Sequence, residues 1–244
     1  MSRLQGKTAV VTGGGSGIGL GAAKRFIDEG AFVFIFGRRQ EALDAALAQL
    51  GPNARAVSGS VTDPADLDRL YASVKAERGG LDILFANAGT GSFAPLGEIT
   101  PEHYDQIFDV NVKGVIFTVQ KALPLMKAGS SIILTGSSTG VMGTPQFSIY
   151  SATKAAIRNL ARSWALDLSG TGIRVNVLSP GPTKTDLALE VVGEEAFEAL
   201  GAMTPLGRLG DPAETGAVAA FLASADSSYM TGGEVFVDGG LAQV

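Results

Sequence analysis

A tyrosine and a lysine four residues apart could form a site for proton transfer. Tyr150 and Lys154 lie in Tyr-Ser-Ala-Thr-Lys, near the start of a segment with helical character. Positions i and i+4 of a helix share one face, and a nearby ammonium favours an ionised phenol. We therefore expect Lys154 to lower the pKa of Tyr150 from about 10, so that the phenol can give or take a proton near neutral pH. The same spacing also occurs by chance on helix surfaces.

Other polar residues could assist this pair. Ser137 follows an apolar strand pattern, and a hydroxyl at a strand end can donate to a developing oxyanion. Ser138 is adjacent, but neighbouring side chains near a strand end point in different directions, so we expect one of the two to face the site. Asn111 lies among apolar residues, where its amide must either bond a backbone carbonyl or hold a water.

A glycine-rich segment near the N-terminus could bind a dinucleotide. TGGGSGIG, residues 12–19, lies between an apolar β-branched run and an amphipathic helix. In such a unit Gly13 permits a tight turn, Gly17 and Gly19 let the backbone approach closely, and the helix N-terminus offers N–H donors to a pyrophosphate. The spacing is G-x-x-x-G-x-G and not the usual G-x-G-x-x-G, and glycine loops also serve as plain turns.

The composition excludes several classes of site and partner. The 244 residues are 45% hydrophobic and predict one large α/β domain over residues 1–244. The absence of cysteine excludes disulfides, thiolate metal sites and a cysteine nucleophile, and a single histidine excludes a histidine-rich metal site. The net charge of −5 does not favour binding to nucleic acid or an anionic membrane. With no secretory leader or membrane-length apolar run, we expect a cytoplasmic protein.

Short apolar strands alternate with longer amphipathic helices along the chain. The expected strands are residues 8–12, 32–36, 54–58, 81–86, 131–135, 173–178 and 234–237. The expected helices are residues 17–29, 40–50, 64–78 with Asp63 as N-cap, 101–127 with Gly114 and Pro124 as tolerated breaks, 148–168, 194–200 and 212–224. This alternation predicts a doubly wound, parallel sheet with helices on both faces and ligands at the carboxyl ends of the strands. The less regular segment 181–208 follows a strand, and is either a mobile substrate lid or an ordinary surface excursion.

Together the motifs resemble those of the short-chain dehydrogenase/reductase family, over nearly the whole chain. They are, in order, TGGGSGIG, Asn87-Ala88-Gly89, Asn111 in Asn-Val-Lys-Gly, Ser137, Tyr150-x-x-x-Lys154, Pro180-Gly181 and Asp238-Gly239-Gly240. Each motif alone is common, whereas their order and spacing are specific. The resemblance implies a single Rossmann-type doubly wound domain with a mostly parallel seven-stranded sheet, and a nicotinamide cofactor.

The resemblance also implies roles for individual residues. Tyr150 would be the acid/base, Lys154 would bind the nicotinamide ribose and tune Tyr150, Ser137 would polarise the substrate carbonyl, and Asn111 would hold a water that relays protons to Lys154. The residues that would contact the cofactor are Gly13, Gly15, Ser16, Gly17, Ile18, Gly19, Arg38, Arg39, Ser60, Val61, Asn87, Ala88, Gly89, Tyr150, Lys154, Pro180, Gly181, Thr183 and Thr185. No metal is expected.

The end of the second strand bears on the choice of cofactor. Members of this family that prefer NAD usually carry an acidic residue there, whereas this chain has Gly37-Arg38-Arg39. A guanidinium attracts the 2′-phosphate that a carboxylate would repel. We therefore expect NADP, with NAD possible, and Arg38 on the phosphate with help from Ser16; the alternative is that both arginines are solvated loop charges. Ser60 is a further departure, since similar chains often have there an aspartate that accepts from the adenine amino group.

The expected reaction is hydride transfer between the nicotinamide cofactor and a ketone or secondary alcohol with an apolar body. The segments that would bind the substrate, 90–96, 139–147 and 185–203, supply mainly apolar side chains. One alternative is a 3-oxoacyl carrier-protein reductase, which the chain from Thr204 onward resembles, although residues 126–131 offer a single lysine for docking an acidic carrier. An alternative from another class is a non-catalytic dinucleotide-binding regulator or scaffold. The presence of all four residues Asn111, Ser137, Tyr150 and Lys154 argues against it.

The resemblance implies a homotetramer. Residues 115–125 and 155–166 are rich in alanine and leucine, which suits either a subunit interface or the core. His103, the only histidine, is expected to lie at the surface or to cap a helix, and Trp164 is expected to pack at a core or subunit contact.

Overall fold

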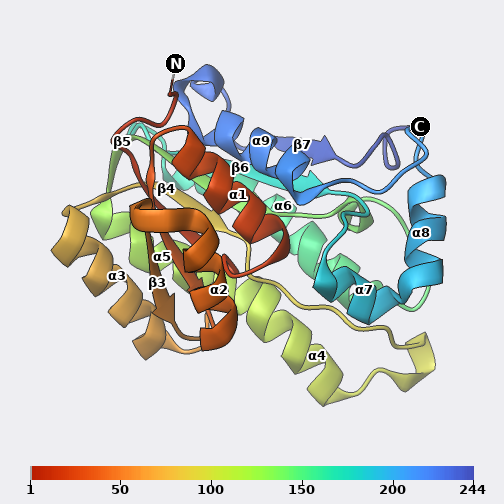
Figure 1. Ribbon diagram of the computed structural model, residues 1–244. Helices are drawn as coiled ribbons and strands as arrows, with labels where there is room; N and C mark the ends of the chain where they lie inside the picture. Colours follow the sequence, from red (N-terminus) through yellow and green to blue (C-terminus); the bar gives the residue numbers. More distant parts are fainter. Residues whose placement is uncertain (1) are drawn as a thin grey trace.

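Seven parallel strands form one sheet in the computed structural model, which describes residues 2–244 (Figure 1). The strands are β1 (Thr8–Thr12), β2 (Phe32–Gly37), β3 (Ala54–Ser58), β4 (Leu81–Ala86), β5 (Met126–Thr135), β6 (Arg174–Pro180) and β7 (Glu234–Val237). Their order is β3-β2-β1-β4-β5-β6-β7, and every adjacent pair is parallel. The predicted Rossmann-type fold with seven strands is confirmed, and the sheet is fully parallel where a mostly parallel one was expected.

Helices cover both faces of this sheet because its strands are apolar on both sides. Helices α1 (Gly17–Asp28), α2 (Gln40–Leu50) and α9 (Pro212–Ala223) pack on one face, and α3 (Pro64–Arg78), α5 (Gly114–Ala122) and α6 (Ser148–Asp167) pack on the other. Along β1, Ala9 and Val11 enter the first core cluster and Val10 enters the second. The continuous apolar strands seen in the sequence are thus explained by burial on two sides. Asp63 caps α3 as predicted, by accepting from the Ala65 N–H at 2.8 Å.

The sheet order reverses direction between β1 and β4, and hydrogen bonds connect the loops that follow these two strands. The hydroxyl of Thr12 accepts from the N–H groups of Asn87 and Ala88, each at 3.0 Å. In return, the Asn87 side chain donates to the Thr12 main-chain oxygen at 3.1 Å. A crevice at such a switch point is where open α/β sheets bind ligands.

The long helix predicted over residues 101–127 is present as a helical run, but it contains a π-helical turn and ends earlier than predicted. Helix α4 (Pro101–Phe108) passes through a π-helical turn, Asp109–Lys113, into α5, which ends at Ala122. Pro124 lacks an N–H and cannot continue an α-helix, so a short 3₁₀ turn, Leu123–Leu125, leads into β5. That strand therefore begins at Met126, five residues before the predicted start.

The segment after β6 contains more helix than the sequence indicated. The predicted helix over 194–200 is present as α8 (Glu194–Ala202), and α7 (Asp186–Val192) precedes it. Thr185 caps α7 by accepting from the Ala188 N–H at 3.2 Å. A threonine followed by a helix-forming stretch is a helix-start pattern that is visible in the sequence. Across residues 2–244, none of the helices combines the length and the apolar character needed to span a bilayer.

Candidate active site

The glycine loop after β1 has the shape of a cradle for an anion. Gly13 and Gly17 have left-handed φ angles of 66° and 51°, which disfavour any side chain. At Gly19 an added Cβ would lie 2.2 Å from the Gly13 oxygen. Ser16 is the N-cap of α1, and its side chain makes no capping hydrogen bond. The first N–H of the helix that donates to a main-chain oxygen is that of Leu20, which donates to Ser16. The preceding N–H groups, including that of Ile18, are the donors that a helix N-terminus offers to a pyrophosphate, so these residues fit a dinucleotide.

The chain after β6 closes one side of this cradle. A Cβ on Gly17 would lie 2.9 Å from Thr185 Cγ2, so Thr185 rests against the glycine loop. Gly181 donates from its N–H to the Val237 oxygen at 3.0 Å, and a Cβ there would lie 2.6 Å from Asp238 Cα. Thr183 is buried and donates to the Gly181 oxygen at 3.1 Å. The Pro180-Gly181 and Asp238-Gly239-Gly240 motifs are therefore packed together beside the loop.

The end of β2 presents positive charge to solvent. Arg38 and Arg39 are exposed, and within the part of the chain that the structure describes neither forms an ion pair. A Cβ on Gly37 would make one ordinary contact, at 3.7 Å from Leu43, so a side chain would fit at that position. The two guanidinium groups are thus free to meet an anionic ligand.

Ser60 stands where similar chains often have an aspartate, and it is held in a local turn. Its hydroxyl lies 2.8 Å from the Thr62 hydroxyl and accepts from the Thr62 N–H at 3.2 Å. Its own N–H donates to Asp66 at 2.7 Å. Val61 is buried. Ser60 therefore offers an adenine ring a hydroxyl that is already engaged, and no charge.

Lys154 is buried in α6 directly beside Tyr150. Its side chain donates to the main-chain oxygen of Thr135 at 2.9 Å, and its Nζ lies 5.4 Å from the centre of the Tyr150 ring. Burial lowers the pKa of Lys154 to about 8 because a low-dielectric surrounding disfavours the ammonium. A Cβ on Gly89 would lie 3.7 Å from this ammonium and 3.4 Å from Asn111 Oδ1, which places the Asn87-Ala88-Gly89 motif at the same site.

Burial raises the pKa of Tyr150, and a hydrogen bond with the Ser137 hydroxyl acts in the opposite direction. The Phe147 ring stacks on Tyr150 with ring centres 4.4 Å apart, and Phe93 stacks on Phe147 at 4.5 Å. The expected lowering of this pKa is not found. Tyr150 is half-buried beneath this aromatic packing, while the Lys154 ammonium is directed to the Thr135 carbonyl.

Asn111 uses its amide to connect two segments of the site. Its Oδ1 accepts from the Thr90 N–H at 2.9 Å, and its Nδ2 donates to the Thr90 oxygen at 2.8 Å and to the Thr153 hydroxyl at 3.2 Å. The Thr153 hydroxyl donates in turn to the main-chain oxygen of Tyr150 at 2.6 Å. The sequence left two roles open for this amide, a bond to a backbone carbonyl or a bound water. The structure has the bond to a backbone carbonyl, that of Thr90. The sequence did not single out Thr90 or Thr153, although Thr153 lies within the Tyr-x-x-x-Lys motif.

Ser137 accepts two hydrogen bonds from one neighbour. The N–H and the hydroxyl of Thr139 donate to Ser137 Oγ at 3.2 and 3.0 Å. Ser138 is buried as well, but it is the Ser137 hydroxyl that acts on the pKa of Tyr150, in the lowering direction. The sequence placed Thr139 only within the substrate segment 139–147, although the Ser-x-Thr spacing is one that forms local side-chain turns.

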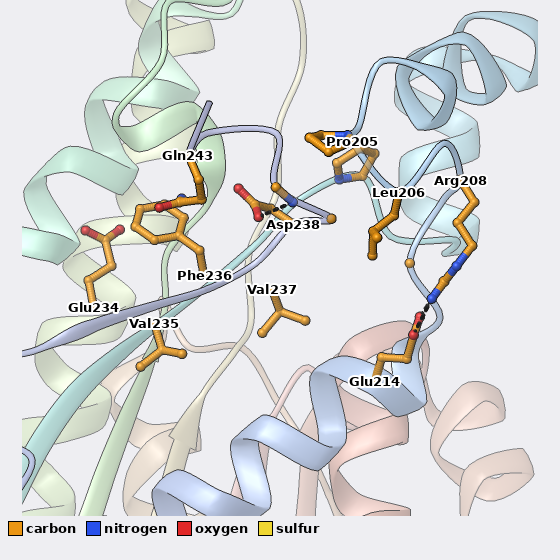
Figure 2. A pocket seen from close by; sticks show the side chains of 14 residues that line it. Pro205, Leu206, Arg208, Glu214, Glu234, Val235, Phe236, Val237, Asp238 and Gln243 are labelled. Atoms are coloured by element: carbon orange, nitrogen blue, oxygen red, sulfur yellow. Dashed lines mark hydrogen bonds and ion pairs between the residues drawn. The ribbon is translucent and has the colours of Figure 1, made fainter.

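One hollow on the surface lies away from these four residues. It has a volume of about 710 Å³ and runs along β7, the chain around Pro205 and the C-terminal loop (Figure 2). Phe236 and Gln243 lie on one side of β7, and Val235 and Val237 lie on the other. None of Asn111, Ser137, Tyr150 and Lys154 lines it. The shifted pKa values of Tyr150 and Lys154 lie at the other site, and such shifts cluster at functional sites.

Two comparisons identify relatives of this sequence. A family model described as enoyl-(acyl carrier protein) reductase matches residues 13–242. The oxidoreductase asL5 of Sarocladium schorii is 65% identical over 246 residues, which cover 100% of this chain and 99% of that protein.

The similar solved structures are reductases or dehydrogenases, as the sequence relatives are. A short-chain type dehydrogenase/reductase from Mycobacterium marinum superposes with a TM-score of 0.92 and 34% identity, covering 100% of this chain and 98% of that one. A 3-ketoacyl-(acyl-carrier-protein) reductase from Brucella melitensis, complexed with NADH, has a TM-score of 0.91 and 32% identity and covers 98% and 99%. The chain therefore belongs to the short-chain dehydrogenase/reductase family and is an oxidoreductase of the kind that uses a nicotinamide cofactor.

Proposed function

We propose that this enzyme interconverts a ketone and a secondary alcohol with an apolar body, using NADP(H). One observation carries the proposal: Ser137, Tyr150 and Lys154 meet at the strand ends that also carry the glycine cradle. When bound, the nicotinamide supplies or accepts the hydride.

The four polar residues have distinct roles in this proposal. In ketone reduction Tyr150 gives its proton to the substrate oxygen, and its raised pKa keeps the phenol protonated for this purpose. Ser137 donates a hydrogen bond to the same oxygen and stabilises the charge that develops there. Lys154 binds the ribose hydroxyls of the cofactor. Asn111 holds the Thr90 segment against α6 and, as the resemblance implies, supports a water that relays protons to Lys154.

The preference for NADP(H) rests on the exposed guanidinium groups of Arg38 and Arg39 and on the lack of a carboxylate at Gly37. A 2′-phosphate matches the fork of donors on a guanidinium. The remaining proposed cofactor contacts come from the glycine loop, Asn87-Ala88-Gly89, Ser60-Val61 and the chain from Pro180 to Thr185.

Segment 181–208 is proposed as a substrate lid. It begins against the glycine loop at Thr185 and carries α7 and α8. Its Leu187 is exposed, as are Phe93 and Val141 on the other segments proposed to bind substrate. Closure over a bound substrate would cover these apolar side chains, which favours a substrate body without charge.

The test is a spectrophotometric screen of ketones and secondary alcohols with NADPH and NADH, following the absorbance of the reduced cofactor. We expect saturable turnover of apolar ketones, faster with NADPH, and loss of turnover by orders of magnitude in Tyr150→Phe. Equal catalytic efficiency with both cofactors would contradict the assignment of Arg38. Cofactor binding without turnover of any carbonyl would favour the non-catalytic alternative.

A second candidate is reduction of a 3-oxoacyl group on a carrier protein, which the likeness to the Brucella melitensis reductase favours. An acidic carrier would need basic residues near the entrance, and Lys127 is the single lysine of segment 126–131. Saturable reduction of an acyl-carrier thioester, with a carrier-dependent KM, would make this the better assignment.

A further inference from the structure

Thr139 is not used by the proposed reaction, yet both of its donors converge on the Ser137 hydroxyl oxygen. The distances are 3.2 Å from its main-chain N–H and 3.0 Å from its own hydroxyl. Ser137 has an extended backbone, and a short 3₁₀ turn begins directly after it at Ser138. The turn therefore brings Thr139 back over the residue that precedes it by two positions.

The hydrogen-bond capacity of serine then limits what Ser137 can do. A serine hydroxyl has one proton to donate and two lone pairs to accept with. Because Thr139 occupies both lone pairs, the further hydrogen bond available to Ser137 is the one it donates. The Ser137 hydroxyl lowers the pKa of Tyr150, which is the effect of a group that donates to the phenolate, and we place the substrate oxygen on the same side of Ser137.

We propose that Thr139 is a positioning residue, which holds the Ser137 hydroxyl as a donor toward Tyr150 and the substrate carbonyl oxygen. This inference rests on the proposed function. A serine hydroxyl that rotates freely would accept from Tyr150 for part of the time and leave the substrate oxygen without its second donor. A donor that is already oriented needs no rearrangement as charge develops on that oxygen. Thr139 therefore acts through Ser137.

A double-mutant cycle tests this inference through kcat and KM for a reducible ketone. Thr139→Val keeps the shape and removes the hydroxyl, Thr139→Ser keeps the hydroxyl, and Ser137→Ala removes the partner. We expect Thr139→Val to lower kcat about 10-fold with the cofactor KM unchanged, and Thr139→Ser to restore kcat to within about 2-fold. In the Ser137→Ala background the valine change should have no further effect, because the group it orients is gone.

A second measurement does not require turnover. The Tyr150 phenol is titrated by NMR of labelled tyrosine rings, and Tyr150→Phe identifies its signal. We expect Thr139→Val to raise the pKa of Tyr150 further, because Ser137 no longer donates steadily to the phenolate. Ser138→Ala, which removes the neighbouring hydroxyl, is the matched control and should leave this pKa unchanged.

Two results would overturn the role of Thr139. One is an equal loss of kcat from Thr139→Val with and without Ser137, and the other is an unchanged pKa of Tyr150 in that variant. Absence of wild-type turnover with every carbonyl would contradict the proposed function instead, and the titration would still decide the role of Thr139.

Discussion

Lys154 is an ammonium at 4% exposure whose side chain donates to the Thr135 main-chain oxygen. Burial lowers its pKa from 10.5 to about 8. Since one pKa unit corresponds to about 1.4 kcal/mol, this burial costs about 3 kcal/mol of folding free energy when the lysine is charged. Between about pH 8 and pH 10.5 the folded state binds fewer protons than the unfolded state. The cost is therefore present in full below about pH 8 and disappears as the pH rises to 10.5.

Lys154→Met should accordingly change stability in a pH-dependent way. The methionine removes the buried charge and leaves the Thr135 oxygen without its donor, a loss of about 1–3 kcal/mol that does not depend on pH. We expect the stability of the variant relative to the wild type to fall by about 2–3 kcal/mol between about pH 7 and pH 10. Urea denaturation at several pH values measures this difference. A difference that is the same at every pH would show that the ammonium is not destabilised by burial.

Gly37 is the residue at which we expect the proposed preference for NADPH to be reversible. An added Cβ has room, with its nearest neighbour Leu43 at 3.7 Å. In Gly37→Asp the carboxylate would repel a 2′-phosphate and accept from a 2′-hydroxyl, so we expect the ratio of kcat/KM for NADPH over NADH to fall by about 100-fold. Gly37→Asn is the matched uncharged control and should change the ratio far less. An unchanged ratio in the aspartate variant would place the adenosine ribose away from this strand end.

At the residue scale the sequence identified partners but not their environment. The spacing of Tyr150 and Lys154 placed an ammonium beside a phenol, and the structure has this neighbour. The direction of the Tyr150 pKa shift was wrong because it follows from burial under Phe147. Burial depends on how α6 meets the loop before it, which local spacing does not encode.

Among the elements, the parallel strands were the most predictable because burial on two faces makes them continuously apolar. The helix over 101–127 was the least predictable. Its amphipathic pattern continues through the π-helical turn at Asp109–Lys113, where Asn111 bonds to Thr90. Only the three-dimensional position of the chain after β4 supplies that partner.

The strand–loop–helix element at the glycine loop should tolerate no side chain at Gly19. A Cβ there would lie 2.2 Å from the Gly13 oxygen and 2.7 Å from Asn87 Nδ2, so both loops of the crevice would have to move. We expect Gly19→Ala to lower the free energy of unfolding by about 1–3 kcal/mol and to weaken NADPH binding more than 10-fold. Urea denaturation and cofactor fluorescence measure the two effects.

Gly97→Ala provides the control for this change. A Cβ on Gly97 would meet no atom within 4 Å, so stability and cofactor affinity should stay close to those of the wild type. If the two alanine variants behave alike, the close approach at Gly19 is not what shapes the crevice.

At the scale of the whole molecule, two hollowed surfaces are lined by none of Asn111, Ser137, Tyr150 and Lys154. One follows β7, an edge strand whose four residues are half-buried (Figure 2). The other has a volume of about 300 Å³ and is lined by α4, the π-helical turn and α5, with the stacked rings of Tyr104 and Phe108. A closed tetramer of dihedral symmetry uses different self-complementary surfaces on each chain. We propose the homotetramer that the resemblance implies, and in it we place the α4–α5 surface against its own copy.

Tyr104→Asp tests this assembly because the ring is 43% exposed and belongs to the α4–α5 hollow. An aspartate there would place two like charges in a self-complementary interface, so we expect the tetramer to separate into dimers held through the β7 surface. Tyr229→Asp is the matched control, since Tyr229 is fully exposed and lines neither hollow. Light scattering after gel filtration should give four times 25.0 kDa for the wild type and the control, and half that mass for Tyr104→Asp. A tetramer that survives Tyr104→Asp would move the interface away from α4 and α5, and a monomeric wild type would contradict the assembly itself.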